Sequence, residues 1–173
     1  GAATARELAA KGAHVVLTAR AAKDLEAVEQ SIFEAGGSAT IAPLDLTEGE
    51  SIGRPASAIT QRWGKLDILM LNAAMLGTLG PVAQIDPVEY NKILTLNLLA
   101  PQAMIAAFDP LLRKSDDAQV IAMTSSVAAG PRAFWAGYAS SKAALENLVQ
   151  SYGQEVGNTA KLRVAIVDPG GTR

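Results

Sequence analysis

A tyrosine and a lysine, Tyr138 and Lys142, stand four residues apart in the chain. On a helix this spacing is about one turn, so both side chains would lie on the same face. An ammonium group close to a phenol favours the phenolate and lowers the pKa of the tyrosine from about 10. We therefore expect Tyr138 to act as a general acid or base. The alternative interpretation is a solvated helix face.

A serine, Ser125, follows the β-rich run 119–124. In open α/β sheets, ligands bind beyond the carboxyl ends of the strands, which is where this serine is expected. Its hydroxyl could donate a hydrogen bond to a substrate carbonyl oxygen as negative charge develops there during hydride attack. Together with Tyr138 and Lys142, it predicts a site for proton transfer and oxyanion stabilisation.

The elements that would position these residues alternate along the chain. Helices are expected at 2–11, 22–35, 48–63 (with a break near Pro55), 87–113 and 136–157, and strands at 14–19, 39–44, 66–71, 119–124 and 162–167. Strands separated by helices predict right-handed crossovers. The fold class is therefore α/β, with a doubly wound parallel sheet and helices on both faces.

The composition favours one soluble globular domain over residues 1–173, since 49% of the residues are hydrophobic and 18% are charged. The formal net charge is −2 without long runs of either sign, which argues against nucleic-acid or membrane-surface binding. No window reaches the roughly 18 apolar residues that span a bilayer. We expect small-molecule chemistry in a cytoplasmic protein.

The chain has no cysteine and a single histidine, His14. Disulfides, thiolate metal sites and a histidine-built metal centre are therefore excluded within these residues, so no metal site is predicted. A Ser-His-Asp hydrolase would need a base outside them. His14 opens an apolar run and is interpreted as structural.

The whole chain resembles the short-chain dehydrogenase/reductase family, a Rossmann-type group of NAD(P)-dependent oxidoreductases. The family's Tyr-x-x-x-Lys motif matches 138–142, and its catalytic serine, about thirteen residues earlier, matches Ser125, with Ser126 as a neighbour that the sequence does not exclude. The family asparagine that holds a water for proton relay matches Asn97. The resemblance also implies that Lys142 binds the nicotinamide ribose, with Tyr138 beside it.

The resemblance extends to cofactor-binding stretches, with departures. The family's Asn-Asn-Ala-Gly appears as Leu-Asn-Ala-Ala, which retains Asn72 and Ala73. Asp45 and Leu46 match the position whose carboxylate meets the adenine amino group, although Asp45 could instead be a helix-capping residue before Thr47.

Two further stretches resemble cofactor contacts of the family. Pro169 and Gly170 resemble a loop that packs near the nicotinamide, and Thr172 matches a polar segment that touches the carboxamide or the pyrophosphate. At the end of the second family strand, Arg20 stands without an acidic neighbour. A guanidinium suits a 2′-phosphate, so NADP(H) is favoured, with NAD(H) and a solvated arginine as alternatives.

The glycine-rich phosphate loop is represented only by Gly1, which matches the third glycine of the family motif. The strand that precedes this loop in the family is central to the sheet, and its loss would leave unpaired strand edges. We therefore expect that the N-terminal strand and a C-terminal segment lie outside the chain, in a parent of about 240 to 260 residues.

The surroundings of the predicted site offer apolar surface. Pro131, Arg132, Phe134 and Trp135 could line a substrate pocket or pack against a partner subunit. Three more apolar residues would lie opposite: Met75, Leu76 and Leu79. The resemblance implies a homotetramer or homodimer through helices 87–108 and 143–152.

These observations predict hydride transfer between NADP(H) and a ketone, an aldehyde or a secondary alcohol, with Tyr138 as general acid or base. A second hypothesis is a dinucleotide-sensing or scaffold protein that has lost catalysis. Retention of Asn97, Ser125, Tyr138 and Lys142 together argues against it. A third hypothesis, a dehydratase or epimerase, would need a substrate domain after residue 173.

Overall fold

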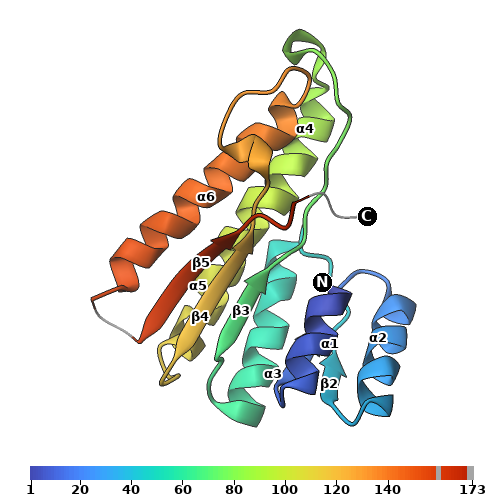
Figure 1. Cartoon of the computed structure of the whole chain (residues 1–173), viewed down its shortest axis with the longest axis vertical. Coiled ribbons are helices and arrows are strands. Elements are labelled where there is room, and N and C mark those ends of the chain that lie inside the picture. The colour runs from blue at the N-terminus through green and yellow to red at the C-terminus, as the bar shows by residue number, and fades with distance from the viewer. Residues whose placement is uncertain (159–160, 171–173) are drawn as a thin grey trace. The chain divides into compact units, whose positions relative to one another are not determined.

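The computed structural model describes residues 1–158 and 161–170, and helices alternate with strands along them (Figure 1). The chain divides into two compact units, Gly1–Pro55 and Ala56–Arg173. The strands accordingly form two parallel sheets, one in each unit.

The first unit is a small α/β layer. Its elements are α1 (Ala2–Ala10), β1 (His14–Leu17), α2 (Ala22–Glu34), β2 (Ser38–Ile41) and the 3-10 helix η1 (Gly49–Ile52). β1 pairs in parallel with β2, and the His14 ring bonds across the pair to the hydroxyls of Ser38 at 2.6 Å and Thr40 at 3.0 Å. Small and aliphatic side chains form the core of this unit: Ala5, Ala9, Leu17, Leu25 and Ile32.

The second unit holds a three-stranded parallel sheet in the order β3-β4-β5. Its elements are β3 (Ile68–Leu71), η2 (Val82–Gln84), α4 (Pro87–Leu94), η3 (Thr95–Leu99), α5 (Ala100–Leu112), β4 (Ala118–Met123), η4 (Ser126–Ala128), α6 (Ala136–Val156) and β5 (Leu162–Val167). Helix α3 (Gly53–Trp63) runs across the boundary of the two units.

The central strand β4 shows how this sheet is buried. Its alternate residues Ala118, Val120 and Ala122 are almost fully buried, whereas the residues between them are half-buried. Helices α5 and α6 pack against the strands of this sheet. Because successive side chains point to opposite faces, one face of the sheet carries the core.

The predicted fold class and the order of the elements are confirmed, and the parallel strands of the described residues fall into two groups. β1 pairs only with β2, and β3 pairs only with β4. One continuous sheet would need a further strand that pairs with the β1-β2 group along one edge and with the β3-β4-β5 group along the other. The described part of the chain has no such strand. The single-domain assignment stays a prediction.

The expected long helix at 87–113 is interrupted. Between α4 and α5, the five residues Thr95–Leu99 form a π-helical turn. Pro101 follows this turn, and a proline lacks the N–H that would bond to the carbonyl of the residue four positions earlier, which is Asn97. A π turn next to such a proline is one way in which a helix accommodates the lost bond. The break expected near Pro55 lies two residues earlier, at the start of α3.

The stretch Pro87–Leu112 is long and apolar enough to cross a membrane by length and composition, with a mean hydropathy of 1.2 over 18 residues. The sequence prediction that no such window exists is therefore wrong. We interpret the stretch as a core helix, because Phe108, Leu111 and Leu112 are buried and α5 packs on β3. Buried polar contacts of Asn97 also tie it to neighbouring segments of the unit.

Candidate active site

The carboxyl end of the three-stranded sheet brings together three of the residues singled out from the sequence. Ser125 directly follows β4, and Tyr138 and Lys142 lie one turn apart on α6. Ser125 acts on Tyr138 as a side-chain hydrogen-bonding partner that lowers its pKa. Nζ of Lys142 lies 5.8 Å from the centre of the Tyr138 ring. The alternative serine, Ser126, is exposed at the start of η4.

Lys142 is a buried cation, with only 2% of its surface exposed. Its Nζ donates to the carbonyl oxygen of Met123, the last residue of β4, at 2.8 Å. On the next residue of the chain, the hydroxyl of Thr124 donates to the carboxylate of Glu146. These two contacts fix α6 on the end of β4. Burial lowers the pKa of Lys142, because the charged form is poorly solvated there.

The pKa of Tyr138 is raised, which contradicts the expected lowering by Lys142. Burial of the phenol is the main cause, and the nearby charge of Asp168 raises the pKa further, while the hydrogen bond with Ser125 opposes both. The ammonium of Lys142 is directed at the Met123 carbonyl, so spacing on the helix was not sufficient to predict its effect.

Asn97 is fully buried in the π turn and holds a neighbouring loop. Its Oδ1 accepts from the backbone N–H of Met75 at 2.8 Å, and its Nδ2 donates to the carbonyl of the same residue at 2.9 Å. Nδ2 also donates to the hydroxyl of Ser141 at 3.0 Å. The side chain therefore connects the loop after β3 with helix α6.

Asp168 is a site residue that sequence reasoning missed. It follows β5 directly, its Oδ1 accepts from the N–H of Gly170 at 3.0 Å, and its charge acts on Tyr138. The signal was present, because an acid stands at the end of the last strand before Pro169. Gly170 adopts a φ of 68°, a left-handed conformation that suits glycine. Thr172 lies outside the described residues.

The remaining cofactor candidates of the second unit follow β3. Asn72 and Ala73 are the two residues after the last strand residue, Leu71, and both are exposed. Their position beyond the carboxyl end of a parallel strand is one where ligands of such sheets bind.

In the first unit, the candidates also lie after strand ends. Arg20 follows β1 by three residues, and Asp45 and Leu46 follow β2. Oδ1 of Asp45 accepts from the backbone N–H of Thr47 at 2.9 Å and from its hydroxyl at 2.7 Å. These bonds lower the pKa of Asp45, with a smaller contribution from the charge of Arg20. The carboxylate therefore caps a turn at Thr47 but not a helix, because the residue that precedes the 3-10 helix η1 is Glu48.

The chemistry of these groups fits the adenosine and phosphate portion of a dinucleotide. Gly1 precedes the first turn of α1, which has no side-chain cap, and a helix N-terminus attracts phosphate. The guanidinium of Arg20 and the carboxylate of Asp45 supply a phosphate partner and a hydrogen-bond acceptor.

Aromatic side chains flank the candidate tyrosine. The ring of Trp135 meets the Tyr138 ring edge-on, with centroids 6.4 Å apart, and the guanidinium carbon of Arg132 lies 4.6 Å from the centre of the Trp135 ring. Phe134 is 59% exposed and has a φ of 70°, which is uncommon for a residue other than glycine. Its carbonyl accepts from the N–H of Gly80 at 2.9 Å.

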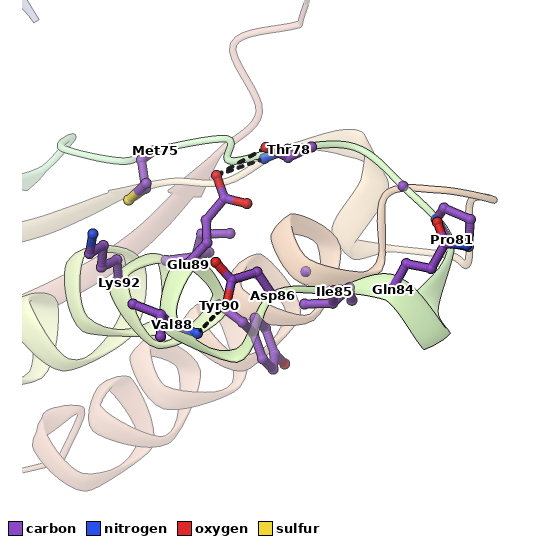
Figure 2. A pocket seen from close by; sticks show the side chains of 13 residues that line it. Met75, Thr78, Pro81, Gln84, Ile85, Asp86, Val88, Glu89, Tyr90 and Lys92 are labelled. Atoms are coloured by element: carbon purple, nitrogen blue, oxygen red, sulfur yellow. Dashed lines mark hydrogen bonds between the residues drawn. The ribbon is translucent and has the colours of Figure 1, made fainter.

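A cleft of about 540 Å³ lies between the loop after β3 and helix α4 (Figure 2). Met75 lines it, as do Asp86, which caps α4, and Glu89, which accepts from Thr78. Gly137 borders it, but none of the four predicted catalytic residues does. Leu76 and Leu79, expected as pocket lining, are exposed residues that do not line this cleft either.

A protein-family model and the relatives of known sequence identify the same family. The family model described as short chain dehydrogenase matches residues 1–173. The chain is 33% identical over 165 residues to the uncharacterized oxidoreductase YciK of Escherichia coli K12. This match covers 94% of the chain and 65% of that protein. It is 29% identical over 170 residues to human dehydrogenase/reductase SDR family member 4, which covers 98% of the chain and 61% of that protein.

Solved structures agree with these relatives. A metagenomic short-chain oxidoreductase in complex with NADP superposes with a TM-score of 0.92 at 35% identity, over 99% of the chain and 77% of that structure. A putative short chain dehydrogenase from Shigella flexneri, complexed with NADP, superposes with a TM-score of 0.90 at 33% identity. The match covers 97% of the chain and 72% of that structure. The chain spans 54 to 65% of the length of the first three curated relatives.

Proposed function

Because the chain belongs to the short-chain dehydrogenase family, we propose that the protein transfers a hydride between NADP(H) and a ketone, an aldehyde or a secondary alcohol. The observation that carries the proposal is the placement of three residues at the carboxyl end of the sheet. Ser125 directly follows β4, and the buried Nζ of Lys142 lies one helical turn from Tyr138 and 5.8 Å from the centre of its ring.

In this proposal, Tyr138 donates a proton to the carbonyl oxygen during reduction and accepts it during oxidation. Its raised pKa keeps the phenol in the protonated, donating form at neutral pH but also makes it a weaker acid than an unperturbed tyrosine. Ser125 stabilises the developing charge on the substrate oxygen through its hydroxyl. Lys142 and Asn97 fix the surroundings, Lys142 through Met123 and Asn97 through Met75. When bound, the nicotinamide supplies or takes up the hydride.

We propose that Gly1, Arg20, Asp45 and Leu46 contact the adenosine and phosphates. In the second unit, the proposed cofactor contacts are Asn72, Ala73, Tyr138, Lys142, Pro169, Gly170 and, beyond the described residues, Thr172. The charge of Arg20 and the NADP found in the related structures support NADP(H) over NAD(H). In Arg20→Ala we expect the ratio of kcat/KM for NADPH to that for NADH to fall about tenfold, the cost of one charge-assisted hydrogen bond. An unchanged ratio would contradict the assignment.

The substrate is proposed to have an apolar portion, because Trp135 lies against the Tyr138 ring. The same aromatic segment remains a candidate for a subunit contact, and we propose a homodimer or homotetramer through the faces of α4, α5 and α6. A cytoplasmic location is proposed as well. The domain is proposed to extend over the whole chain.

The proposal is tested by following NADPH absorbance with the purified protein and a panel of aliphatic and aromatic ketones and aldehydes. Turnover in the wild type and a loss of at least about 100-fold in Tyr138→Phe are expected, since general acid catalysis contributes about that much or more. NADPH binding without turnover of any carbonyl or alcohol would favour the second candidate, a dinucleotide-sensing protein.

A further inference from the structure

Ser141 stands one residue before Lys142 on α6 and is fully buried, at 0% exposure. Its hydroxyl donates to the backbone carbonyl of Tyr138 at 2.7 Å. The same oxygen accepts from Nδ2 of Asn97 at 3.0 Å. A serine hydroxyl has a single proton, so donation to Tyr138 leaves the oxygen lone pairs for the asparagine. Both ends of this bridge are residues of the candidate site.

The contacts of Asn97 extend this bridge to the loop after β3. Its Nδ2 carries two protons, one for Ser141 and one for the carbonyl of Met75, while Oδ1 accepts from the Met75 N–H. One hydrogen-bonded chain therefore joins α6, the π turn and the loop. Every polar group in it is paired, and exchanging partners would leave buried donors or acceptors unsatisfied.

We infer that Ser141 is a positioning residue for the proton transfer assigned to Tyr138. It fixes the first turn of α6, which carries Tyr138, against the amide of Asn97. The inference rests on the proposed function, because it concerns how the proposed acid is held in place. A small displacement of a reacting group lowers the rate of chemistry more than it lowers substrate binding.

The neighbouring serine provides a matched control. Ser140 is exposed, and its hydroxyl bonds to the phenol oxygen of Tyr90 at 2.9 Å and to the carbonyl of Gly137 at 3.1 Å. Ser140 and Ser141 therefore carry the same side chain on the same helix, but of these two adjacent serines only Ser141 is hydrogen-bonded to Asn97.

The experiment compares steady-state kinetics of Ser141→Ala and Ser140→Ala with NADPH and a ketone that the wild type reduces. We expect kcat of Ser141→Ala to fall about tenfold or more with KM changed less than about twofold, while Ser140→Ala keeps the wild-type kcat. Ser141→Thr keeps the hydroxyl and should recover most of the rate. If Ser141→Ala does not fold by circular dichroism, Ser141→Cys, with a weaker hydrogen-bonding group of similar size, should show an intermediate kcat.

A double-mutant cycle separates positioning from general destabilisation. Because Ser141 acts through Asn97, Ser141→Ala should lower kcat less than about twofold in an Asn97→Ala background. Equal kinetics of the Ser141 and Ser140 variants, or fully multiplicative effects in the cycle, would overturn the inference. Tyr138→Phe in the same assay distinguishes the two failures: full activity there overturns the proposed function, whereas its loss leaves that function standing whatever Ser141 does.

Discussion

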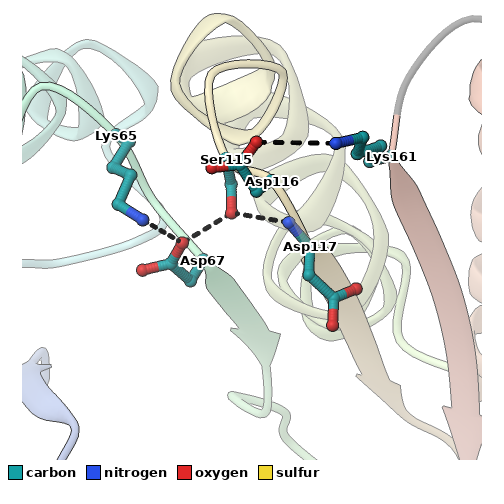
Figure 3. Close-up of polar contacts among 6 residues, drawn as sticks. All are labelled: Lys65, Asp67, Ser115, Asp116, Asp117 and Lys161. Carbon is teal, nitrogen blue, oxygen red and sulfur yellow. Dashed lines mark hydrogen bonds and ion pairs between the residues drawn. The ribbon is translucent and has the colours of Figure 1, made fainter.

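The two ends of the three-stranded sheet in the second unit differ in whether their charged side chains are exposed or buried. At the amino end, exposed ion pairs join Lys65 with Asp67 at 3.1 Å and Lys161 with Asp116 at 3.6 Å, and Ser115 donates to Asp67 (Figure 3). At the carboxyl end, a single lysine, Lys142, is buried and bonds to a backbone carbonyl.

The difference shows that burial changes the energetic cost of the same charged group. Exposed pairs are screened by water and contribute little to stability, about 0 to 1 kcal/mol each. A buried ammonium is costly unless it is hydrogen-bonded, so its presence marks a place where the fold tolerates an unfavourable group. Such perturbed groups cluster at functional sites. The comparison therefore favours the carboxyl end as the reactive one.

The comparison is tested most strongly by replacing one lysine at each end with methionine. Lys142→Met removes the ammonium that bonds to Met123 and lies beside Tyr138, and we expect kcat to fall by about 100-fold or more. Lys65→Met removes only an exposed pair and should leave kcat within about twofold. Comparable losses in both variants, measured by NADPH oxidation, would show that the contrast between the two ends has no catalytic meaning.

A smaller effect is expected from removing one carboxylate charge at each end. Asp168 raises the pKa of Tyr138, so Asp168→Asn should lower that pKa. Alcohol oxidation needs the phenolate, so the pH at which kcat/KM for oxidation rises should become lower. Ketone reduction needs the protonated phenol, so the pH at which kcat/KM for reduction falls should become lower as well. Asp116→Asn, at the amino end, should leave both limbs in place. Profiles of kcat/KM against pH check this, and a limb that moves upward in Asp168→Asn would contradict it.

The smallest effect concerns the amino end alone. Ser115 donates to Asp67 at 2.5 Å, and this bond is the main cause of the lowered pKa of that carboxylate. We expect Ser115→Ala to lower the free energy of unfolding by about 1 kcal/mol and to leave kcat unchanged. Urea unfolding and NADPH oxidation measure the two quantities. A loss of kcat without a loss of stability would place function at this end too.

The elements of the fold were predictable because hydrophobic runs and helix stops are local signals. The helix containing Tyr138 and Lys142 and the strand before Ser125 were expected within one or two residues of their observed bounds. The π turn was not expected, since the effect of Pro101 on the carbonyl of Asn97 depends on a helix that hydropathy patterns describe as continuous.

The surroundings of the candidate site were less predictable than its members. The direction of the Tyr138 pKa depends on burial and on Asp168, which is thirty residues away in the sequence. The bridge from Ser141 to Asn97 depends on the packing of α6 against the π turn. Such contacts join distant segments, and a single sequence carries no spacing rule for them.

The most direct test of the central claim is the single-turnover rate of carbonyl reduction in Tyr138→Phe, measured together with NADPH affinity by fluorescence titration. If Tyr138 supplies the proton, hydride transfer should slow by about 100-fold or more, while the Kd for NADPH changes less than about tenfold. A wild-type rate of hydride transfer in this variant would contradict the assignment of Tyr138 as the acid.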